Sequence, residues 1–384
     1  MRILLFGPYP LPGQTLVGGA TAVVQMLARG LAKRPGLEVF VAAAQPGIAP
    51  GQENDGPVIV HRLPVTRFRR LRWQRDMRRA LVGVAAAVQP DVIHAHGVNF
   101  YGAAALDAPY PSLVTVHGVI KREAALSGSQ SAREWLAWRY DALYEAWVLR
   151  RARHCTAISP YVRRAFAGYP HIAWRDIANP VDDDCFDLRP QPQPGRLLCP
   201  ARVIPRKGID TLIRAFTRVA PDFPPAQLHI AGETDTHPSY VAACRDLIAA
   251  AGLQERVRFL GNLARPDLLA AYESAQAVVL AARQETAPVA LAEAMAAGCP
   301  VVATAVGGVP DMVGDELAGL LVPPDDPAAL AAALSRPLSD PAQAARWGQQ
   351  ARHLAQRFRL DSVLDQTVEA YGGVIGDWRL GIGD

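Results

Sequence analysis

The run Arg283–Thr304, RQETAPVALAEAMAAGCPVVAT, has the pattern of a helix start that can bind an anion. It reads as a strand end, a loop, a helix and another strand, with Pro288 at the first helical position and Gly298 just past the last. The first amides of a helix have no partner within it and carry partial positive charge. The N–H groups expected to point out of this helix start are those of Val289, Ala290 and Leu291.

Two glutamates flank this helix start. Glu285 lies in the preceding loop, and Glu293 lies a turn and a half into the helix, where its side chain leans back toward the start. Carboxylates beside a phosphate site repel the phosphate unless they bind something else, and sugar hydroxyls are the natural target. The alternative is an ordinary helix with a surface glutamate.

A second pair of candidates, Arg202 and Lys207, follows a predicted strand in the segment ARVIPRKG. Cations that leave a strand end can reach a ligand bound in the crevice of an α/β fold. The chain has only three lysines beside 37 arginines, so a lysine here indicates that a compact point charge is needed. A solvated basic loop is the alternative.

A glycine pair, Gly18 and Gly19, lies between the first predicted strand and a helix. Glycine lets the backbone come close to a ligand at a helix start. The region holds no G-x-G-x-x-G motif, which counts against a nicotinamide or flavin enzyme.

Short β-rich runs alternate with helical segments along the whole chain, which is typical of parallel sheets covered by helices. Strands are predicted at 2–6, 38–43, 58–61, 91–95, 112–117, 154–159, 196–200, 227–231, 257–260, 277–280, 300–304 and 320–322. Helices are predicted near 20–33, 72–88, 132–152, 209–219, 240–251, 266–274, 288–297 and 327–334.

The alternation breaks at a proline-containing stretch, so we expect two α/β domains. The predicted divisions are an N-terminal domain at 1–180, a linker at 181–195, a C-terminal domain at 196–360 and a last helix at 361–384 that packs back on the N-terminal domain. Two such halves place their strand ends, and so the ligand, along a shared crevice.

Several short motifs follow one another along nearly the whole chain. They are the glycine pair at 18–19, DVIHAHG at 91–97, TVHG at 115–118, AIS at 157–159, NPVD at 179–182, the pair Arg202 and Lys207, FLG at 259–261, and E-x7-E at 285–293 followed by EAMAAGCPVVAT. In this order the chain resembles family 4 of the retaining glycosyltransferases. The resemblance implies the GT-B fold, which has two Rossmann-like domains with a cleft between them.

The resemblance also implies a role for each matching residue. Arg202 and Lys207 would neutralise the diphosphate of a nucleotide-sugar donor and make it a better leaving group. Glu293 would accept hydrogen bonds from the donor ribose, and Glu285 would hold hydroxyls of the transferred sugar. The amides after Pro288, at Val289 and Ala290, would line the sugar and phosphates together with Gly18 and Gly19. His117 would face the donor sugar.

The activity so implied is transfer of a hexose-type sugar, with its anomeric configuration retained, from a UDP- or GDP-linked donor to a glycan or polyprenyl-lipid-linked acceptor. The setting would be polysaccharide or glycolipid biosynthesis, with no metal, no other cofactor and no nucleic acid. Family members often read E-G-F-G or E-G-F-P where this chain has Glu285-Thr286-Ala287-Pro288, so the identity of the sugar does not carry over.

Two features near these motifs are interpreted as structural. His94 and His96 alternate along one strand, and we expect their side chains to point to opposite faces, with His94 buried. The acidic run Asp182-Asp183-Asp184 resembles a metal site but falls in the predicted linker, so we predict no metal there.

The segment Thr66–Arg79 holds seven arginines with apolar residues, Trp73 and Met77 among them, between the charges. This pattern favours contact with an anionic lipid surface or an acceptor through Arg67–Arg79, and a charged loop and helix face is the alternative. Of the tryptophans at 135, 138 and 147, we expect Trp147 to pack in the core and the other two to be interfacial.

Composition sets the remaining limits. Half the residues are apolar and a fifth are charged, which indicates a globular protein, and no apolar run is long enough for a signal peptide or a membrane span. Five cysteines without a CxxC pair fit a reduced, cytoplasmic setting. Residues 1–180 carry net charge +11 and the rest −7, which suggests an anionic partner for the first half, such as the inner face of a membrane.

Two rival functions stay open from the sequence. A sugar-nucleotide epimerase on a similar fold would need further acid and base residues in the crevice. A binding protein that has lost catalysis is the other, and the presence of Arg202, Lys207, Glu285 and Glu293 argues against it.

Overall fold

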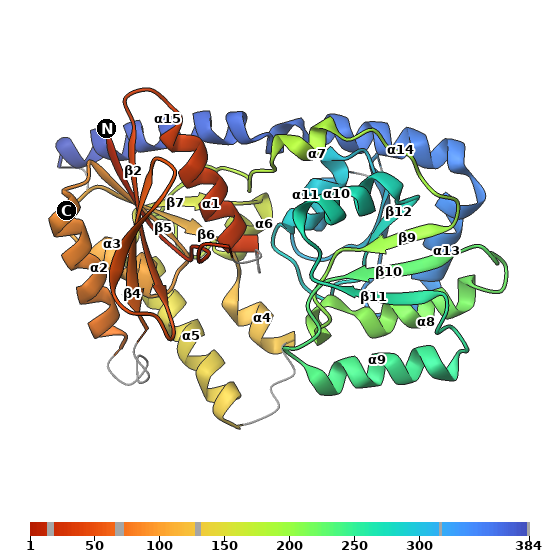
Figure 1. The fold of residues 1–384 in the computed structure, drawn as a ribbon. Coiled ribbons are helices and arrows are strands. Elements are labelled where there is room, and N and C mark those ends of the chain that lie inside the picture. The colour runs from red at the N-terminus through yellow and green to blue at the C-terminus, as the bar shows by residue number, and fades with distance from the viewer. Residues whose placement is uncertain (14–18, 66–72, 127–131, 315–316, 382–384) are drawn as a thin grey trace. The chain divides into compact units, whose positions relative to one another are not determined.

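The computed structural model describes residues 1–13, 19–65, 73–126, 132–314 and 317–381 of the chain (Figure 1). Contacts divide the chain into two compact units. Unit 1 consists of Met1–Ala124, Ser129–Pro180 and Leu360–Asp384, and unit 2 consists of Ala125–Gly128 and Val181–Arg359. Each unit is built around its own sheet.

The sheet of unit 1 has the strand order β3-β4-β2-β1-β5-β6-β7-β8 and is parallel except for the antiparallel pair β3 and β4. Its strands are β1 (Arg2–Phe6), β2 (Glu38–Gln45), β3 (Gly51–Asp55), β4 (Val58–Pro64), β5 (Val92–His96), β6 (Ser112–Val116), β7 (His154–Ala157) and β8 (Ala173–Asp176). Central strands such as β1 are apolar along their length because helices cover both faces.

Helices pack on both faces of this sheet. They are α1 (Gly19–Ala32), α2 (Arg75–Val88), α3 (Phe100–Asp107), α5 (Ala132–Arg151), α6 (Pro160–Ala165) and α15 (Leu360–Arg379), with α4 (Ile120–Leu126) at the edge of the unit. The last helix, α15, packs beside α1 and against β5 and β6 (Figure 1). A side chain at Gly30 would meet Leu364 at 2.7 Å, so glycine permits this close approach.

The sheet of unit 2 is fully parallel, in the order β11-β10-β9-β12-β13-β14. Its strands are β9 (Arg196–Cys199), β10 (Gln227–Ala231), β11 (Val257–Gly261), β12 (Ala277–Leu280), β13 (Val301–Thr304) and β14 (Gly319–Val322). The chain reverses its direction of travel across the sheet between β9 and β12. Loops that leave the carboxyl ends of two such strands flank the crevice where α/β sheets bind ligands.

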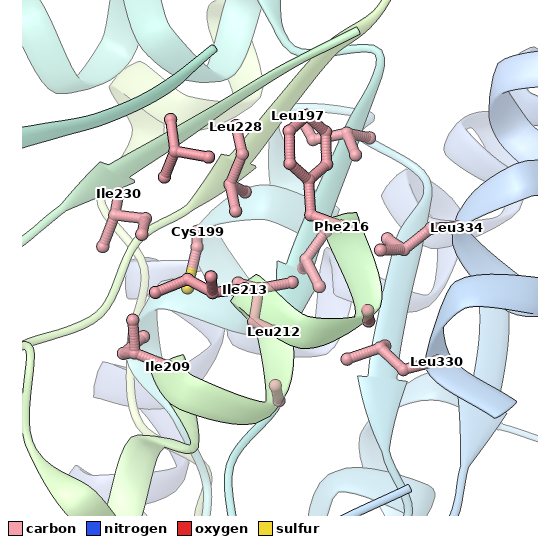
Figure 2. Packing of buried hydrophobic residues seen from close by; sticks show 14 of the residues in the cluster. Leu197, Cys199, Ile209, Leu212, Ile213, Phe216, Leu228, Ile230, Leu330 and Leu334 are labelled. Atoms are coloured by element: carbon pink, nitrogen blue, oxygen red, sulfur yellow. The ribbon is translucent and has the colours of Figure 1, made fainter. Parts of the chain in front are cut away.

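The helices of unit 2 enclose a core that lies mainly between the sheet and α8. They are α7 (Asp183–Asp187), the 3₁₀ turn η1 (Pro205–Lys207), α8 (Ile209–Val219), α9 (Pro238–Ala250), α10 (Arg265–Ser274), α11 (Val289–Ala296), α12 (Val309–Val313), α13 (Pro327–Ser339), α14 (Pro341–Leu354) and the 3₁₀ turn η2 (Ala355–Phe358). Figure 2 shows Phe216 of α8 among leucines of β9, β10 and α13, and its side chain is fully buried.

The predicted α/β class is confirmed, and every predicted helix and strand is present within a few residues of its expected bounds. The short elements β3, β8, α3, α4, α6, α7 and α12, the 14-residue helix α14 and the two 3₁₀ turns were not predicted. The predicted linker at 181–195 is not a plain connection, because it contains α7 and belongs to unit 2. Asp182 caps that helix by accepting a hydrogen bond from the amide of Asp183 at 3.1 Å.

All five cysteines are buried and have free thiols. Among the helices that the structure describes, none combines the length and the apolar character that crossing a bilayer requires.

We expect Phe216→Ala to lower the free energy of unfolding of unit 2 by about 3–5 kcal/mol, because it leaves a cavity in the core. Urea denaturation followed by circular dichroism measures the change. Arg214→Ala, at an exposed position of the same helix, is the control and should change stability by less than about 0.5 kcal/mol. Equal effects of the two substitutions would contradict this account of the core.

Candidate functional site

Two loops of unit 2 meet where the strand order reverses, and their backbones are tied together. The loop after β9 carries η1 and Gly208, and the loop after β12 runs toward α11. The amide of Arg283 donates to the carbonyl of Arg206 at 2.8 Å. Gly208 has φ +61°, and a Cβ there would lie 2.0 Å from the carbonyl oxygen of Ala281. Only glycine fits this position, and it sets the place of the preceding Lys207.

Lys207 and Glu285, one from each loop, form an ion pair at this point. Nζ of Lys207 contacts Oε1 of Glu285, and Nη1 of Arg206 lies 3.5 Å from Oε2 of the same carboxylate. Glu285 is buried. Burial alone would raise the pKa of Glu285, but Lys207 and Arg206 outweigh it and hold that pKa below its usual range. The carboxylate is therefore ionised and shared between two cations.

The backbone of Glu285 is held from its other side by a glycine turn after β13. The amide of Gly308 donates to the carbonyl of Glu285 at 3.2 Å. Gly307 has φ +55°, and a Cβ there would lie 1.6 Å from the same carbonyl oxygen. Gly307 and Gly308 thus fix the position of the Glu285 backbone, because the absence of a side chain at Gly307 lets the two backbones approach closely.

The start of α11 presents two amides that bond to no described residue. Pro288 is the N-cap, so the helix begins at Val289, one residue later than predicted, and the carbonyl of Pro288 accepts from the amides of Leu291 at 3.0 Å and Ala292 at 3.3 Å. The prediction that the Leu291 amide is free is therefore wrong, because this amide donates to the carbonyl of the N-cap residue three positions earlier. Val289 and Ala290 remain as half-buried donors that suit an anion.

Glu293 lies in α11 within a separate polar cluster. Its Oε1 accepts from Nη1 of Arg265 at 2.5 Å, and its Oε2 accepts from the hydroxyl of Tyr272 at 3.1 Å. Asp184 of α7 binds the other side of the guanidinium at 2.5 Å. Burial raises the pKa of Glu293, although Arg265 opposes the shift. Each carboxylate oxygen of Glu293 keeps a lone pair for a further donor.

Arg202 is not part of either cluster. It lies half-buried in the loop after β9, and its guanidinium makes no hydrogen bond within the described part of the chain. The neighbouring amide of Val203 bonds to the carbonyl of Glu233 at 2.9 Å, which places this loop beside the one after β10. The structure thus brings Lys207 and Glu285 together, while Arg202 lies apart from them and near Glu233, whose pKa its charge helps to lower.

The acidic run at 182–184 divides its carboxylates among different tasks. Asp182 caps α7, Asp183 pairs with Arg359 at 2.7 Å, and Asp184 holds Arg265. No group of three or more His, Cys, Asp or Glu side chains within the described ranges is placed to hold a metal ion. The run belongs to the fold and, through Arg265, to the surroundings of Glu293.

In unit 1 the candidate His117 follows β6 and contacts a row of histidines. Nε2 of His117 lies 3.0 Å from Nδ1 of His96, and the ring centroids of His96 and His94 are 4.3 Å apart. The prediction that His94 and His96 point to opposite faces is wrong, because residues two apart on a strand share a face. His94 is buried as expected and bonds to Tyr371 of α15 at 2.8 Å and to Thr115 at 2.6 Å.

The glycine pair and the arginine-rich segment are described only in part. Gly19 is exposed and begins α1, and Gly18 lies outside the described residues, as do 66–72. Met77 is buried, and Trp73 packs against Tyr140 at 5.2 Å and Trp147 at 5.7 Å between ring centroids. Met77 is therefore not available to a lipid surface, whereas Trp73 stays partly exposed, and contact of this segment with a lipid surface stays a prediction.

Sequence reasoning missed Arg206, Arg265, Tyr272 and Asp184. Arg206 adjoins Lys207 and could have been found as a second cation of the same turn. Arg265 and Tyr272 reach Glu293 from α10, and no local pattern shows that contact. Asp184 was assigned to the linker, although its carboxylate anchors Arg265.

Two family models together cover most of the chain. Residues 182–354 match the model described as glycosyl transferases group 1, and residues 17–184 match that of glycosyltransferase family 4. A glycogen synthase of Mycobacterium tuberculosis is 30% identical over 313 residues, which are 77% of this chain and 72% of that protein. The chain belongs to the family 4 glycosyltransferases.

Other matches to this glycosyltransferase differ in extent. A D-inositol 3-phosphate glycosyltransferase of Salinispora tropica is 37% identical over 139 residues, which are 36% of this chain and 29% of that protein. Sucrose-phosphate synthase from Thermosynechococcus elongatus has the same fold, with a TM-score of 0.83 at 24% identity over 98% of this chain and 99% of that one. Anabaena HepE, solved in complex with UDP-glucose, gives 0.74 at 21% identity over 97% and 100%. These structures confirm the GT-B fold.

The histidine row predicts how the stability of unit 1 depends on pH. Burial lowers the pKa of His117 to about 4 and that of His94 to about 3, both below the value of about 6.5 in an unfolded chain. Stability is therefore full above pH ~6.5 and falls as pH drops toward ~4, because the unfolded chain takes up protons first. For His117 the loss between about pH 7 and 5 is up to about 2 kcal/mol.

Urea unfolding followed by tryptophan fluorescence checks this, since six of the seven tryptophans lie in unit 1. His117→Asn should lose less stability on acidification than the wild type. His353→Asn, at an exposed position of unit 2, is the control and should follow the wild type. Identical pH slopes for all three chains would show that His117 does not contribute to this pH dependence.

Proposed function

We propose that this glycosyltransferase transfers a hexose-type sugar from a nucleoside diphosphate sugar to a glycan or lipid-linked acceptor, with retention of configuration and without a metal. The supporting observation is the ion cluster of Lys207, Arg206 and Glu285 where the strand order of unit 2 reverses. It combines cations for a diphosphate with a carboxylate for sugar hydroxyls. Retention and metal independence rest on the resemblance to the family.

The diphosphate is the proposed ligand of the positive groups. Lys207 and Arg202 supply full charges, and the amides of Val289 and Ala290 supply the partial positive charge of a helix start. Groups that neutralise the diphosphate stabilise it most as it leaves, because its charge then increases. We assign the same four groups to donor binding, together with Pro288, which fixes the direction of the two amides, and Gly19.

The two carboxylates are proposed to bind the hydroxyls at either end of the diphosphate. Glu285 accepts from the transferred sugar, and Glu293 accepts from the ribose through the lone pairs that Arg265 and Tyr272 leave unused. His117 is proposed to contact an oxygen of the donor sugar. No protein base is assigned, because in this scheme the leaving phosphate deprotonates the acceptor on the same face.

The comparisons support the coarse class of donor and acceptor. HepE was solved with UDP-glucose, and the matched relatives are named as glycogen synthase and D-inositol 3-phosphate glycosyltransferase. We propose a UDP- or GDP-linked donor and a role in polysaccharide or glycolipid biosynthesis. Contact of unit 1 with an anionic membrane surface stays a prediction, carried within the described residues by the exposed Arg75 and Arg79.

Lys207→Ala is expected to lower kcat/KM by about 10²-fold or more, because a charge that stabilises the leaving diphosphate is lost. The donor is first found by thermal shift with UDP, GDP and ADP and then with their sugars, and turnover is measured with that donor. Lys33→Ala, at an exposed position, is the control. Unchanged kinetics in Lys207→Ala would remove this residue from the site, and a wild-type chain without turnover on any donor would favour a binding protein.

Glu293→Gln is expected to weaken binding of the free nucleoside diphosphate by about tenfold, because a neutral amide replaces one charged acceptor. Isothermal titration calorimetry measures the dissociation constant. Glu255→Gln, at an exposed position after α9, is the matched control. An affinity in Glu293→Gln equal to that of the control would refute the assignment of Glu293 to the ribose.

A further inference from the structure

His96 stands between a structural histidine and the histidine assigned to the donor sugar. It is buried at the carboxyl end of β5, with the ring of His94 on one side and that of His117 on the other. Its Nδ1 lies 3.0 Å from Nε2 of His117. Its Nε2 is buried and bonds to no described residue. The ring of His96 is therefore linked by hydrogen bonding to His117.

The three rings are neutral near pH 7. Burial lowers the pKa of His94 to about 3 and that of His117 to about 4, and it holds the pKa of His96 well below the usual range. The neighbouring imidazoles lower the pKa of His96 further. A neutral imidazole has one N–H donor and one bare nitrogen acceptor. The hydrogen bond between His96 and His117 therefore contains one proton, which is bound either to Nδ1 of His96 or to Nε2 of His117.

The unpaired nitrogen of His96 decides which ring carries it. If Nε2 of His117 held the proton, Nδ1 of His96 would be the acceptor and Nε2 of His96 would be a buried N–H without an acceptor. Either unsatisfied group costs free energy, but buried N–H groups without an acceptor are rarer in proteins than buried acceptors without a donor. If Nδ1 of His96 holds the proton instead, only a bare nitrogen is left enclosed. The second arrangement leaves the proton of His117 on its Nδ1.

We propose that His96 is a positioning residue that fixes the tautomer of His117. The Nδ1–H of His96 donates to Nε2 of His117, so that His117 presents a neutral Nδ1–H donor. This nitrogen bonds to no described residue and, unlike Nε2 of His96, is not enclosed. The inference rests on the proposed function for its ligand, an oxygen of the donor sugar, which accepts from an N–H.

The row is anchored at its far end, which keeps His96 in place. Nδ1 and Nε2 of His94 bond to Tyr371 and Thr115, and Thr115 bonds to Thr156 of β7 at 2.5 Å. His94 therefore has no nitrogen left for His96 and meets it by ring contact alone. The sole hydrogen-bond partner of the His96 side chain among the described residues is thus His117, as a tautomer-setting role requires.

Nitrogen NMR of the full chain labelled with ¹⁵N-histidine tests the tautomer directly, at a pH near 7.5 where the rings are neutral. His117→Gln identifies the signals of residue 117. We expect the proton of both His96 and His117 on Nδ1. A proton on Nε2 of His117 in the wild-type chain would overturn the proposal, and this measurement needs neither a variant of His96 nor a substrate.

Two substitutions of His96 separate the tautomer from packing. Asn places its side-chain amide N–H near the position of Nδ1–H, whereas Leu fills space without a donor. In His96→Leu we expect the proton of His117 to be no longer confined to Nδ1. In His96→Asn we expect it to remain on Nδ1. If the tautomer of His117 is the same in both variants, His96 does not set it.

Kinetics with the identified donor give the second measurement. His96→Leu should lower kcat about tenfold or more while the dissociation constant of the nucleoside diphosphate stays within about twofold, and His96→Asn should recover kcat to within about threefold of the wild type. Equally slow Asn and Leu variants would reduce His96 to a packing residue. A wild-type chain without turnover would overturn the proposed function, and the NMR result would still decide the tautomer.

Discussion

The buried carboxylate of Glu285 is the constraint on which the arrangement of unit 2 depends. A carboxylate taken out of water without partners is strongly unfavourable, and removing one partner of a buried pair leaves the other uncompensated. Lys207 and Arg206, which come from the loop after β9, must therefore stay in contact with this carboxylate. Gly208 and Gly307 permit the backbone approaches that bring these loops together. The carboxylate, the cations and the glycines thus depend on one another.

The reversal of strand order explains why these residues are found at this place. β9 and β12 are neighbours in the sheet but are separated in sequence by two β–α units. The loops after β9 and β12 leave the carboxyl edge of the sheet side by side. Lys207 and Glu285 therefore meet although they are 78 positions apart in the sequence. In unit 1 the strands β5 and β6 are neighbours that follow each other in the sequence, and their carboxyl ends bring His96 beside His117.

The periodicity of the sequence was enough for the two parallel sheets, because buried parallel strands are apolar runs and amphipathic helices have their own period. Lys207 and Glu285 could also be predicted, since each follows a strand end. The contacts of Glu293 could not, because Arg265, Tyr272 and Asp184 come from α10 and α7, and their meeting depends on how helices pack. The exposed β3 and the partly exposed β8 lack the apolar runs that reveal a strand.

Under the proposed function, local charge balance explains how a unit of net negative charge would bind a diphosphate. Glu285 is outnumbered by Lys207 and Arg206, so that cluster carries an excess positive charge, and Arg202 adds a cation without a bonded partner. Glu293 is partly neutralised by Arg265, which weakens its repulsion of phosphate. Under the proposed function, an arriving diphosphate competes with Glu285 for Lys207. Arg206 still holds the carboxylate, and the oxygen so released becomes an acceptor for a sugar hydroxyl. A ligand with both phosphate and sugar therefore replaces each contact that it breaks, whereas a free phosphate does not.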